Sequence, residues 1–142
     1  MNQAELIHRY YATFNSGDRE AFLGLLAEGV VHDLNQGRTE IGKDAFRQFL
    51  ERMDRCYAEQ VEEVCLFQSN ADPSRAAAEF FVRGVYLSTD EGLPPATGQN
   101  YRIRVGAFFE ISDGHISRIT NYYNLEEWLR LIGAGGVEIS RE

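Results

Sequence analysis

The sequence predicts an α+β domain in which an antiparallel sheet curls against helices placed first in the chain. Apolar residues recur at helical spacing mainly within residues 1–57, strand-like runs fill most of residues 60–124, and turn signals separate the two patterns. A chain of 142 residues holds one domain with a single core. We therefore expect a domain over residues 1–132 and a polar tail over 133–142.

The first part of the chain predicts three helices and a hairpin. Residues 3–15 carry apolar side chains at helical spacing, and Gly17 ends that helix. Asp18 caps a second helix over residues 19–27. The stretch "EGVVHDLNQG" then predicts a short strand and a turn at Gln36 and Gly37, with residues 39–41 as the hairpin partner. The third helix lies in "GKDAFRQFLERMDRCY", which has one apolar and one charged side.

The second part of the chain predicts four strands and a closing helix. Strand-like runs cover residues 60–68, 75–87, 100–111 and 115–124, and "SDG" gives the turn before the last run. The loop "STDEGLPPATG" contains two adjacent prolines, which cannot donate to a strand ladder, so it predicts a rigid connection. Residues 125–132 predict a short helix.

Composition excludes several classes of protein. The formal charge of −8 offers no basic face, which disfavours nucleic acids and anionic membranes as partners. The N-terminus has no signal-peptide pattern, and no apolar run approaches membrane-spanning length, so we expect a cytoplasmic protein. Cys56 and Cys65 lack metal-ligand spacing and are interpreted as apolar fillers with free thiols. No motif predicts a metal or a cofactor.

Four segments carry a resemblance to a known family: "RYYATFNSGDREAF", "VVHDLNQG", "GLPPATGQNYRIRVGAFF" and "DGHISRITNYYNLEEW". In this order they resemble the nuclear transport factor 2-like superfamily, and within it the steroid Δ-isomerase-related, polyketide cyclase-like branch. The last segment is also similar to limonene epoxide hydrolase. The resemblance implies a cone-like curved sheet wrapped around the N-terminal helices, a pocket inside the cone, and a homodimer. It does not decide the chemistry, because this fold serves many functions.

Asp33 is the first candidate catalytic residue. The resemblance implies that a carboxylate near this point takes a proton from a carbon beside a ketone, which requires a mostly apolar cavity and a raised pKa. Two registers stay open, because strand faces alternate. In one, the pocket faces Val31, Asp33 and Asn35; in the other, it faces Val30, His32 and Leu34, and His32 becomes the candidate base.

Tyr10 is the second candidate, since by resemblance it would donate a hydrogen bond to an enolate oxygen. Its place in a helical apolar stripe equally favours a core residue. The acidic partner that steroid isomerases place beside this tyrosine would fall on Ala107 or Gly106, neither of which has a side-chain donor. The resemblance therefore implies an incomplete oxyanion hole, for which Asn121 or Tyr123 would substitute.

The last strand places Ile119, Asn121 and Tyr123 on one face, and the resemblance implies that this face lines the pocket. Asn121 stands where the hydrolase has a carboxylate, and an amide cannot accept a proton from water. Glu79 is a further polar residue in an apolar strand, interpreted as pointing to solvent or pairing with Arg83 or Arg104. The expected pocket walls are Phe14, Phe80, Val82, Tyr86, Val105, Ala107, Phe109 and Ile119.

Three functions remain open. The first is a steroid isomerase-related enzyme that transfers protons on a small, mostly apolar substrate in an enclosed pocket. The second is a non-catalytic module of the same fold that binds a small apolar ligand or dimerises. The third is an epoxide hydrolase, dehydratase or cyclase with a rearranged site, built on a residue such as His32 or Glu79.

Overall fold

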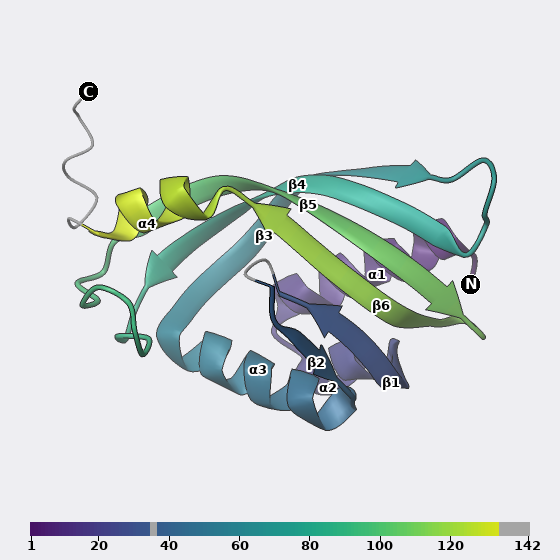
Figure 1. Ribbon diagram of the computed structural model, residues 1–142, viewed down its shortest axis with the longest axis horizontal. Helices are drawn as coiled ribbons and strands as arrows, with labels where there is room; N and C mark the ends of the chain where they lie inside the picture. The colour runs from purple at the N-terminus through teal and green to yellow at the C-terminus, as the bar shows by residue number, and fades with distance from the viewer. Residues whose placement is uncertain (35–36, 134–142) are drawn as a thin grey trace.

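A computed structural model describes residues 1–34 and 37–133, which form a curved, unclosed six-stranded sheet with helices against its concave face (Figure 1). The predicted α+β class is confirmed. The expected tail lies outside the described residues except for Gly133, and so do Asn35 and Gln36 of the expected turn. The elements are α1 (Gln3–Ser16), α2 (Arg19–Leu23), β1 (Leu26–Asp33), β2 (Thr39–Ile41), α3 (Lys43–Cys56), β3 (Tyr57–Gln68), β4 (Arg75–Tyr86), β5 (Asn100–Ser112), β6 (His115–Tyr123) and α4 (Leu125–Gly133).

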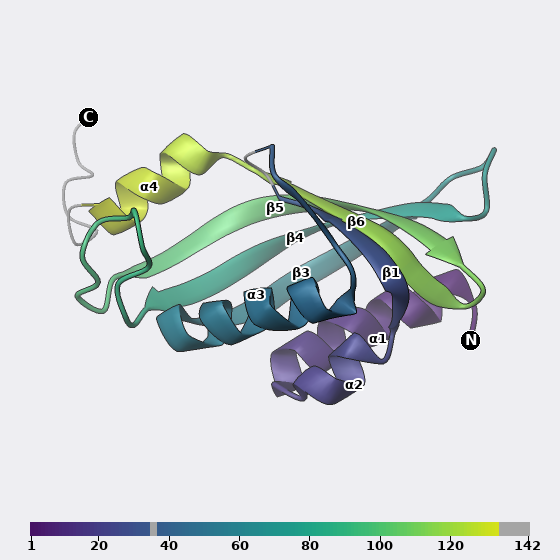
Figure 2. The same ribbon diagram turned by 60° about the horizontal axis from the view of Figure 1, so that its bottom comes forward.

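Helix α1 begins and ends where its sequence indicates. Asn2 and Glu5 form a capping box at its start. Gly17 ends the helix with a φ of 80°, a left-handed conformation that glycine adopts without strain. The buried side of α1 carries Leu6, Ile7, Tyr10 and Tyr11. In Figure 2, α1, α2 and α3 lie together on one side of the sheet.

Two predicted boundaries are wrong. The second helix ends at Leu23 instead of residue 27, because the chain turns at Gly24 and Leu26 already pairs with Ile116 of β6. Strand β3 begins at Tyr57, three residues earlier than expected, directly after α3. Both corrections come from strand pairing between distant segments, which local spacing does not report.

The sheet has the strand order β2-β1-β6-β5-β4-β3. The long strands pair antiparallel as expected, and β1 runs parallel to β6, so the sheet is mixed at this one pairing. His32 of β1 lies opposite Ile119 of β6, and Ile119 lies opposite Phe109 of β5. This register decides which side chains of β1 face the helices.

Asn15, near the end of α1, covers the free edge of β3. Its side-chain amide donates to the carbonyl of Val61 at 2.9 Å, and its carbonyl accepts the Val61 N–H at 2.7 Å. The side chain thus satisfies backbone groups that an edge strand would otherwise leave open. This contact fixes the beginning of β3 against the helices. No helix within the described residues is long and apolar enough to cross a membrane.

Candidate functional site

A cavity of about 430 Å³ lies between the helices and the concave face of the sheet. This volume falls in the range of small-molecule sites, roughly 300–1,000 Å³. Its wall is mostly aromatic and is formed by α1, α2, α3, every strand except β2, the loop after β4, and α4. The aromatic residues are Tyr10, Tyr11, Phe14, Phe22, Phe46, Phe49, Tyr57, Phe80, Tyr101, Tyr123 and Trp128. Such a wall suits a flat apolar ligand.

His32 and Leu34 line this cavity, and Asp33 does not. The structure therefore has the second of the two registers, with His32 inside. Asp33 lies on the other face of β1, where it accepts hydrogen bonds from Thr120 at 2.7 Å and Thr39 at 2.8 Å. Arg118 is within 3.3 Å of the same carboxylate. The expectation that Asp33 faces the pocket is corrected, because the pairing of β1 with β6 turns it away.

The pKa of Asp33 is shifted in the direction opposite to the expected one. Hydrogen bonds from Thr120 and Thr39 lower the pKa of this carboxyl, and the Arg118 guanidinium lowers it further. A carboxylate held in this way is a weak base. Asp33 therefore serves the packing of β1 against β2 and β6.

The imidazole of His32 is 2% exposed and lies between two phenylalanine rings. It stacks on Phe46 with ring centroids 4.3 Å apart and meets Phe49 edge-on at 4.7 Å. Burial lowers the pKa of His32 to about 4, although Glu40 and Asp33 oppose this shift. The ring is therefore neutral at pH 7.

Glu40 of β2 lies beside the imidazole. Its Oε1 is 3.9 Å from Nδ1 of His32, and neither atom has a hydrogen-bond partner among the described residues. Because Nδ1 faces this carboxylate, Nε2 is the nitrogen left for a ligand. A base whose second nitrogen is turned toward a carboxylate is a common arrangement in proton-transfer sites.

Tyr10 and Tyr11 contribute phenol groups to the same cavity. Tyr10 packs on Phe22 with ring centroids 4.5 Å apart. The centroid of Phe22 lies 5.9 Å from that of Phe46, the ring on which His32 stacks. Burial raises the pKa of both tyrosines, so both are undissociated donors at neutral pH. The hydroxyl of Tyr11 is buried and has no partner among the described residues.

The structure brings together most of the other predicted residues. Asn121 and Tyr123 line the cavity, as do Phe14, Phe80, Val82 and Val105. Burial, and next the charge of Glu59, raises the pKa of Tyr123. Four expected walls are absent from the lining: Tyr86, Ala107, Phe109 and Ile119.

These four residues are buried beneath the layer that faces the cavity. Ala107, Phe109 and Ile119 belong to the core cluster that also contains the buried residues of α1 and α2. Tyr86 belongs to a second cluster and donates a hydrogen bond to the carbonyl of Pro94 in the loop after β4. They face inward as predicted, but other side chains lie over them.

Glu59 of β3, which was not predicted as a site residue, also lines the cavity. The hydroxyl of Tyr101 donates to Oε2 of Glu59 at 2.5 Å, and burial raises the pKa of the Glu59 carboxyl. The available signal was a polar residue at an inward position, because Tyr57, Glu59 and Val61 alternate on one face. Glu79, by contrast, is exposed and lies 3.7 Å from Arg104, as expected.

The loop after β4 closes the end of the cavity where Glu59 and Tyr101 lie. Asp90 of this loop is 6% exposed and accepts a hydrogen bond from the Tyr57 hydroxyl at 2.8 Å. The buried amide of Gln99 ties the loop to α4 through the carbonyl of Ile132 at 2.8 Å. This loop is thus part of the cavity wall.

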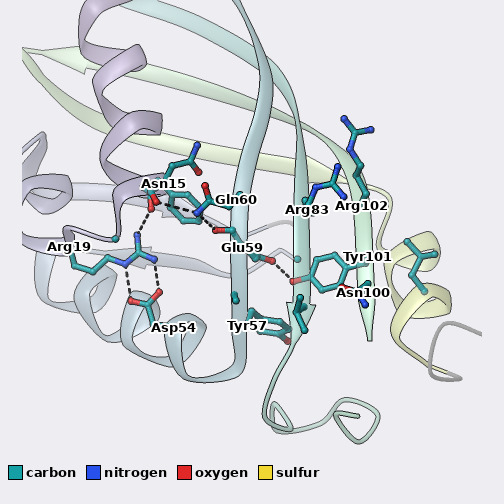
Figure 3. Close-up of a pocket in the computed structure, with 16 residues that line it drawn as sticks. Asn15, Arg19, Asp54, Tyr57, Glu59, Gln60, Arg83, Asn100, Tyr101 and Arg102 are labelled. Carbon is teal, nitrogen blue, oxygen red and sulfur yellow. Dashed lines mark hydrogen bonds and ion pairs between the residues drawn. The ribbon is translucent and has the colours of Figure 1, made fainter. Parts of the chain in front are cut away.

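A second, shallower depression of about 610 Å³ lies outside the cavity, where α1 ends beside β3 (Figure 3). Its charged groups are paired: Arg19 bonds Asp54 at 2.8 Å, and Arg83 bonds Glu62 at 2.8 Å. Glu59 and Tyr101 border both hollows. The depression is more open to solvent than the cavity, and the aromatic cavity is the candidate site.

The described residues contain no group of three His, Cys, Asp or Glu side chains arranged to hold a metal ion. Cys56 is buried, as expected for an apolar filler, whereas Cys65 is exposed on β3, so that interpretation of Cys65 is wrong. Both thiols are free.

Comparisons with known proteins agree with the observed fold. The family model described as SnoaL-like domain matches residues 7–119. A search of curated proteins found no match.

Solved structures supply close relatives. A candidate polyketide cyclase from Pseudomonas putida KT2440 is 53% identical, with a TM-score of 0.90 over 94% of this chain and 99% of that chain. Another from Xanthomonas campestris pv. campestris is 51% identical, with a TM-score of 0.85 over 90% of this chain and 94% of that chain. A candidate ketosteroid isomerase from Kribbella flavida is 24% identical, with a TM-score of 0.59 over 84% and 76% of the two chains, and shows the shared fold alone.

Proposed function

The chain belongs to the SnoaL-like domain family, and on that premise we propose that it is an enzyme that transfers protons on a small, flat, mostly apolar ketone. His32 is the proton acceptor. The observation that carries this proposal is a neutral imidazole in the wall of an aromatic cavity, with Nδ1 turned toward Glu40. The names of the relatives that are about half identical, candidate polyketide cyclases, support a carbonyl-bearing substrate.

The proposed reaction creates a positive and a negative charge close together in the cavity. Nε2 of His32 takes a proton from the carbon beside a carbonyl, giving an imidazolium and an enolate. A pKa of about 4 makes the free imidazole a weak base, but the nearby enolate and the Glu40 carboxylate both stabilise the imidazolium. The buried phenol of Tyr10 donates a hydrogen bond to the enolate oxygen.

Two reactions can follow this proton transfer, and in each of them His32 gives the proton back. In an isomerisation, the imidazolium returns the proton to another carbon of the conjugated enolate. In a ring closure, the enolate carbon attacks a second carbonyl of the same molecule, a carbon–carbon bond forms, and the resulting alkoxide takes the proton from His32. Both use the same base and differ only in the substrate.

Hydrogen–deuterium exchange tests the proposal without knowledge of the natural substrate. β-Tetralone is a flat ketone with exchangeable protons beside its carbonyl, and proton NMR in D₂O follows their loss. The wild-type protein should accelerate exchange, and His32→Gln should lower this rate by a factor of about 10²–10⁴, the usual contribution of a general base. Asp33→Asn is the matched control, because Asp33 is the next residue on the outer face. Equal rates for wild type and His32→Gln would refute the role of His32.

A second candidate function is a non-catalytic small-ligand binder. The low pKa of His32 favours it, because a group of this basicity abstracts protons poorly without a stabilising partner. It predicts that β-tetralone binds in the cavity while its exchange rate stays that of the buffer.

We also propose that two copies pair through the convex face of the sheet, as the resemblance implies. Phe108 and Tyr122 lie there with ring centroids 5.7 Å apart and are 43% and 55% exposed. Sedimentation equilibrium should give a dimer for the wild type and a monomer for Phe108→Glu. A monomeric wild type would refute this pairing.

A further inference from the structure

Glu59, Gly84 and Tyr101 form one row across three neighbouring strands. Glu59 of β3 lies opposite Gly84 of β4, and Gly84 lies opposite Tyr101 of β5. A Cβ atom built on Gly84 would sit 2.2 Å from Cζ of Tyr101, so the phenol ring occupies the space above this glycine. Only glycine lets the ring cross β4 and bring its hydroxyl to Glu59.

The hydrogen bond from Tyr101 occupies one oxygen of the carboxyl group and leaves the other open. Tyr101 donates to Oε2, and none of the described residues donates a hydrogen bond to Oε1. The charged groups nearest Glu59 are Arg19 of α2 and Asp54 of α3, which are bonded to each other at 2.8 Å. Tyr123 of β6 also faces it. A cavity-lining carboxyl therefore has one oxygen left as an acceptor.

The arginines of the cavity wall are already neutralised. Arg19 bonds Asp54, Arg38 bonds Glu40 at 2.8 Å, and Arg52 lies 3.8 Å from Asp90. Glu59 and Glu91 add further acidic groups to the same wall. A negatively charged ligand would thus meet paired cations and additional carboxyl groups, which disfavours it.

We propose that Glu59 and Tyr101 form a second polar subsite of the cavity, which takes a hydroxyl group of an uncharged ligand through Oε1 of Glu59. This deepens the proposed function and rests on it only in assigning the ligand to the same cavity. Phe109, in the row of His32, and Tyr101, in the row of Glu59, are eight residues apart on β5. The substrate is thus a flat, neutral molecule with a reacting carbonyl at one end and a phenolic or enolic hydroxyl remote from it.

Three matched probes test this preference by titration calorimetry at pH 7. 2-Naphthol can donate a hydrogen bond, 2-methoxynaphthalene has the same ring system without the donor, and 2-naphthoate carries a negative charge. We expect 2-naphthol to bind roughly tenfold tighter than the methyl ether, the usual scale of one hydrogen bond, and 2-naphthoate to bind most weakly. Equal affinities for the first two, tightest binding of 2-naphthoate, or no binding of any probe would overturn the subsite.

Glu59→Gln turns the free acceptor into an amide whose nitrogen donates. This variant should bring the ratio of the affinities for 2-naphthol and 2-methoxynaphthalene close to one and weaken the discrimination against 2-naphthoate. Glu79→Gln removes an exposed carboxylate from the other face of the sheet and should leave the ratio unchanged. Retention of the wild-type ratio in Glu59→Gln would overturn the proposal, and the wild-type series decides it if this variant does not fold.

The two proposals fail separately. His32→Gln should abolish proton exchange on β-tetralone and keep the preference for 2-naphthol, because His32 and Glu59 lie in different rows of the sheet. Loss of the preference with intact exchange would refute the subsite alone. In the wild-type protein, absent exchange with an intact preference would refute the catalytic role of His32 alone.

Discussion

Oε1 of Glu40 lies 3.9 Å from Nδ1 of His32, and the two residues face each other directly in the β1–β2 register. The carboxylate favours the protonated ring, while burial between Phe46 and Phe49 favours the neutral ring and prevails. The imidazole is therefore held neutral beside a group that would stabilise its charged form. This balance underlies the role proposed for His32.

The pH dependence of the free energy of unfolding should reveal the low pKa of His32. The folded-state pKa is about 4 against 6.5 for an ordinary histidine, so both states are neutral above pH 6.5 and the unfolded state binds the proton first below it. The neutral ring thus contributes stability that is full above pH 6.5 and falls by up to about 3 kcal/mol toward pH 4. Urea unfolding at pH 7, 5.5 and 4.5 should show this loss in the wild type relative to His32→Gln. Parallel pH curves for the two proteins would contradict it.

Asp33→Asn should destabilise the fold at neutral pH, and the loss of stability should become smaller as the pH falls. The folded-state pKa of Asp33 is lowered, so its contribution is present above the ordinary value of 3.8 and is lost as the pH falls through the folded-state value. Weaker hydrogen bonds to Thr120 and Thr39 should cost about 1–3 kcal/mol at pH 7. The difference from wild type, measured by urea unfolding, should shrink toward pH 3. A difference that grows on acidification is the opposing result.

Two glycines of the sheet should respond differently to alanine. Gly84→Ala places a Cβ against the ring of Tyr101 and should cost about 1–3 kcal/mol, because the ring must move away from Glu59. Gly106→Ala is the control: no atom lies within 4 Å of the added Cβ, so its effect should stay within about 0.5 kcal/mol. Thermal unfolding compares them. A Gly84→Ala protein as stable as the wild type would argue against the crossing of Tyr101 over β4.

Asn15→Ala should loosen the free edge of β3. It removes both hydrogen bonds to the backbone of Val61, at a cost of about 1–3 kcal/mol. The Val61 amide proton should also exchange faster with solvent. Asn100→Ala, at an exposed position, should change neither quantity measurably. An unchanged Val61 exchange rate in Asn15→Ala would show that these two hydrogen bonds do not protect the edge of β3.

The main elements were predictable because their signals are local. Helices α1 and α3 have clear apolar stripes, and the turn before β6 is marked by "SDG". The face of β1 was not predictable, since Val30, His32 and Leu34 and the alternate set with Val31 and Asp33 are both compatible with a strand. Pairing of His32 with Ile119, far along the chain, selects between them.

The end of the cavity that contains Glu59 and Tyr101 was not predictable from the sequence for the same reason. Tyr101 reaches Glu59 from 42 residues away, and Tyr57 meets Asp90 across 33 residues. Neither pair forms a spaced motif in the sequence. The resemblance directed attention to Asp33 and Tyr10. Tyr10 does line the cavity, but the arrangement of the strands places His32 there in place of Asp33 and adds Glu59.

The most direct test of this account is a ¹⁵N NMR titration of the imidazole of His32, from pH 3 to pH 8, with and without 2-naphthol. His32→Gln identifies its signals among those of the three histidines of the chain. The account predicts a ring that stays neutral down to a pKa of about 4 and whose signals shift when the ligand binds. A pKa near ~6.5, the ordinary value for histidine, with signals indifferent to ligand, would contradict a buried base in the cavity.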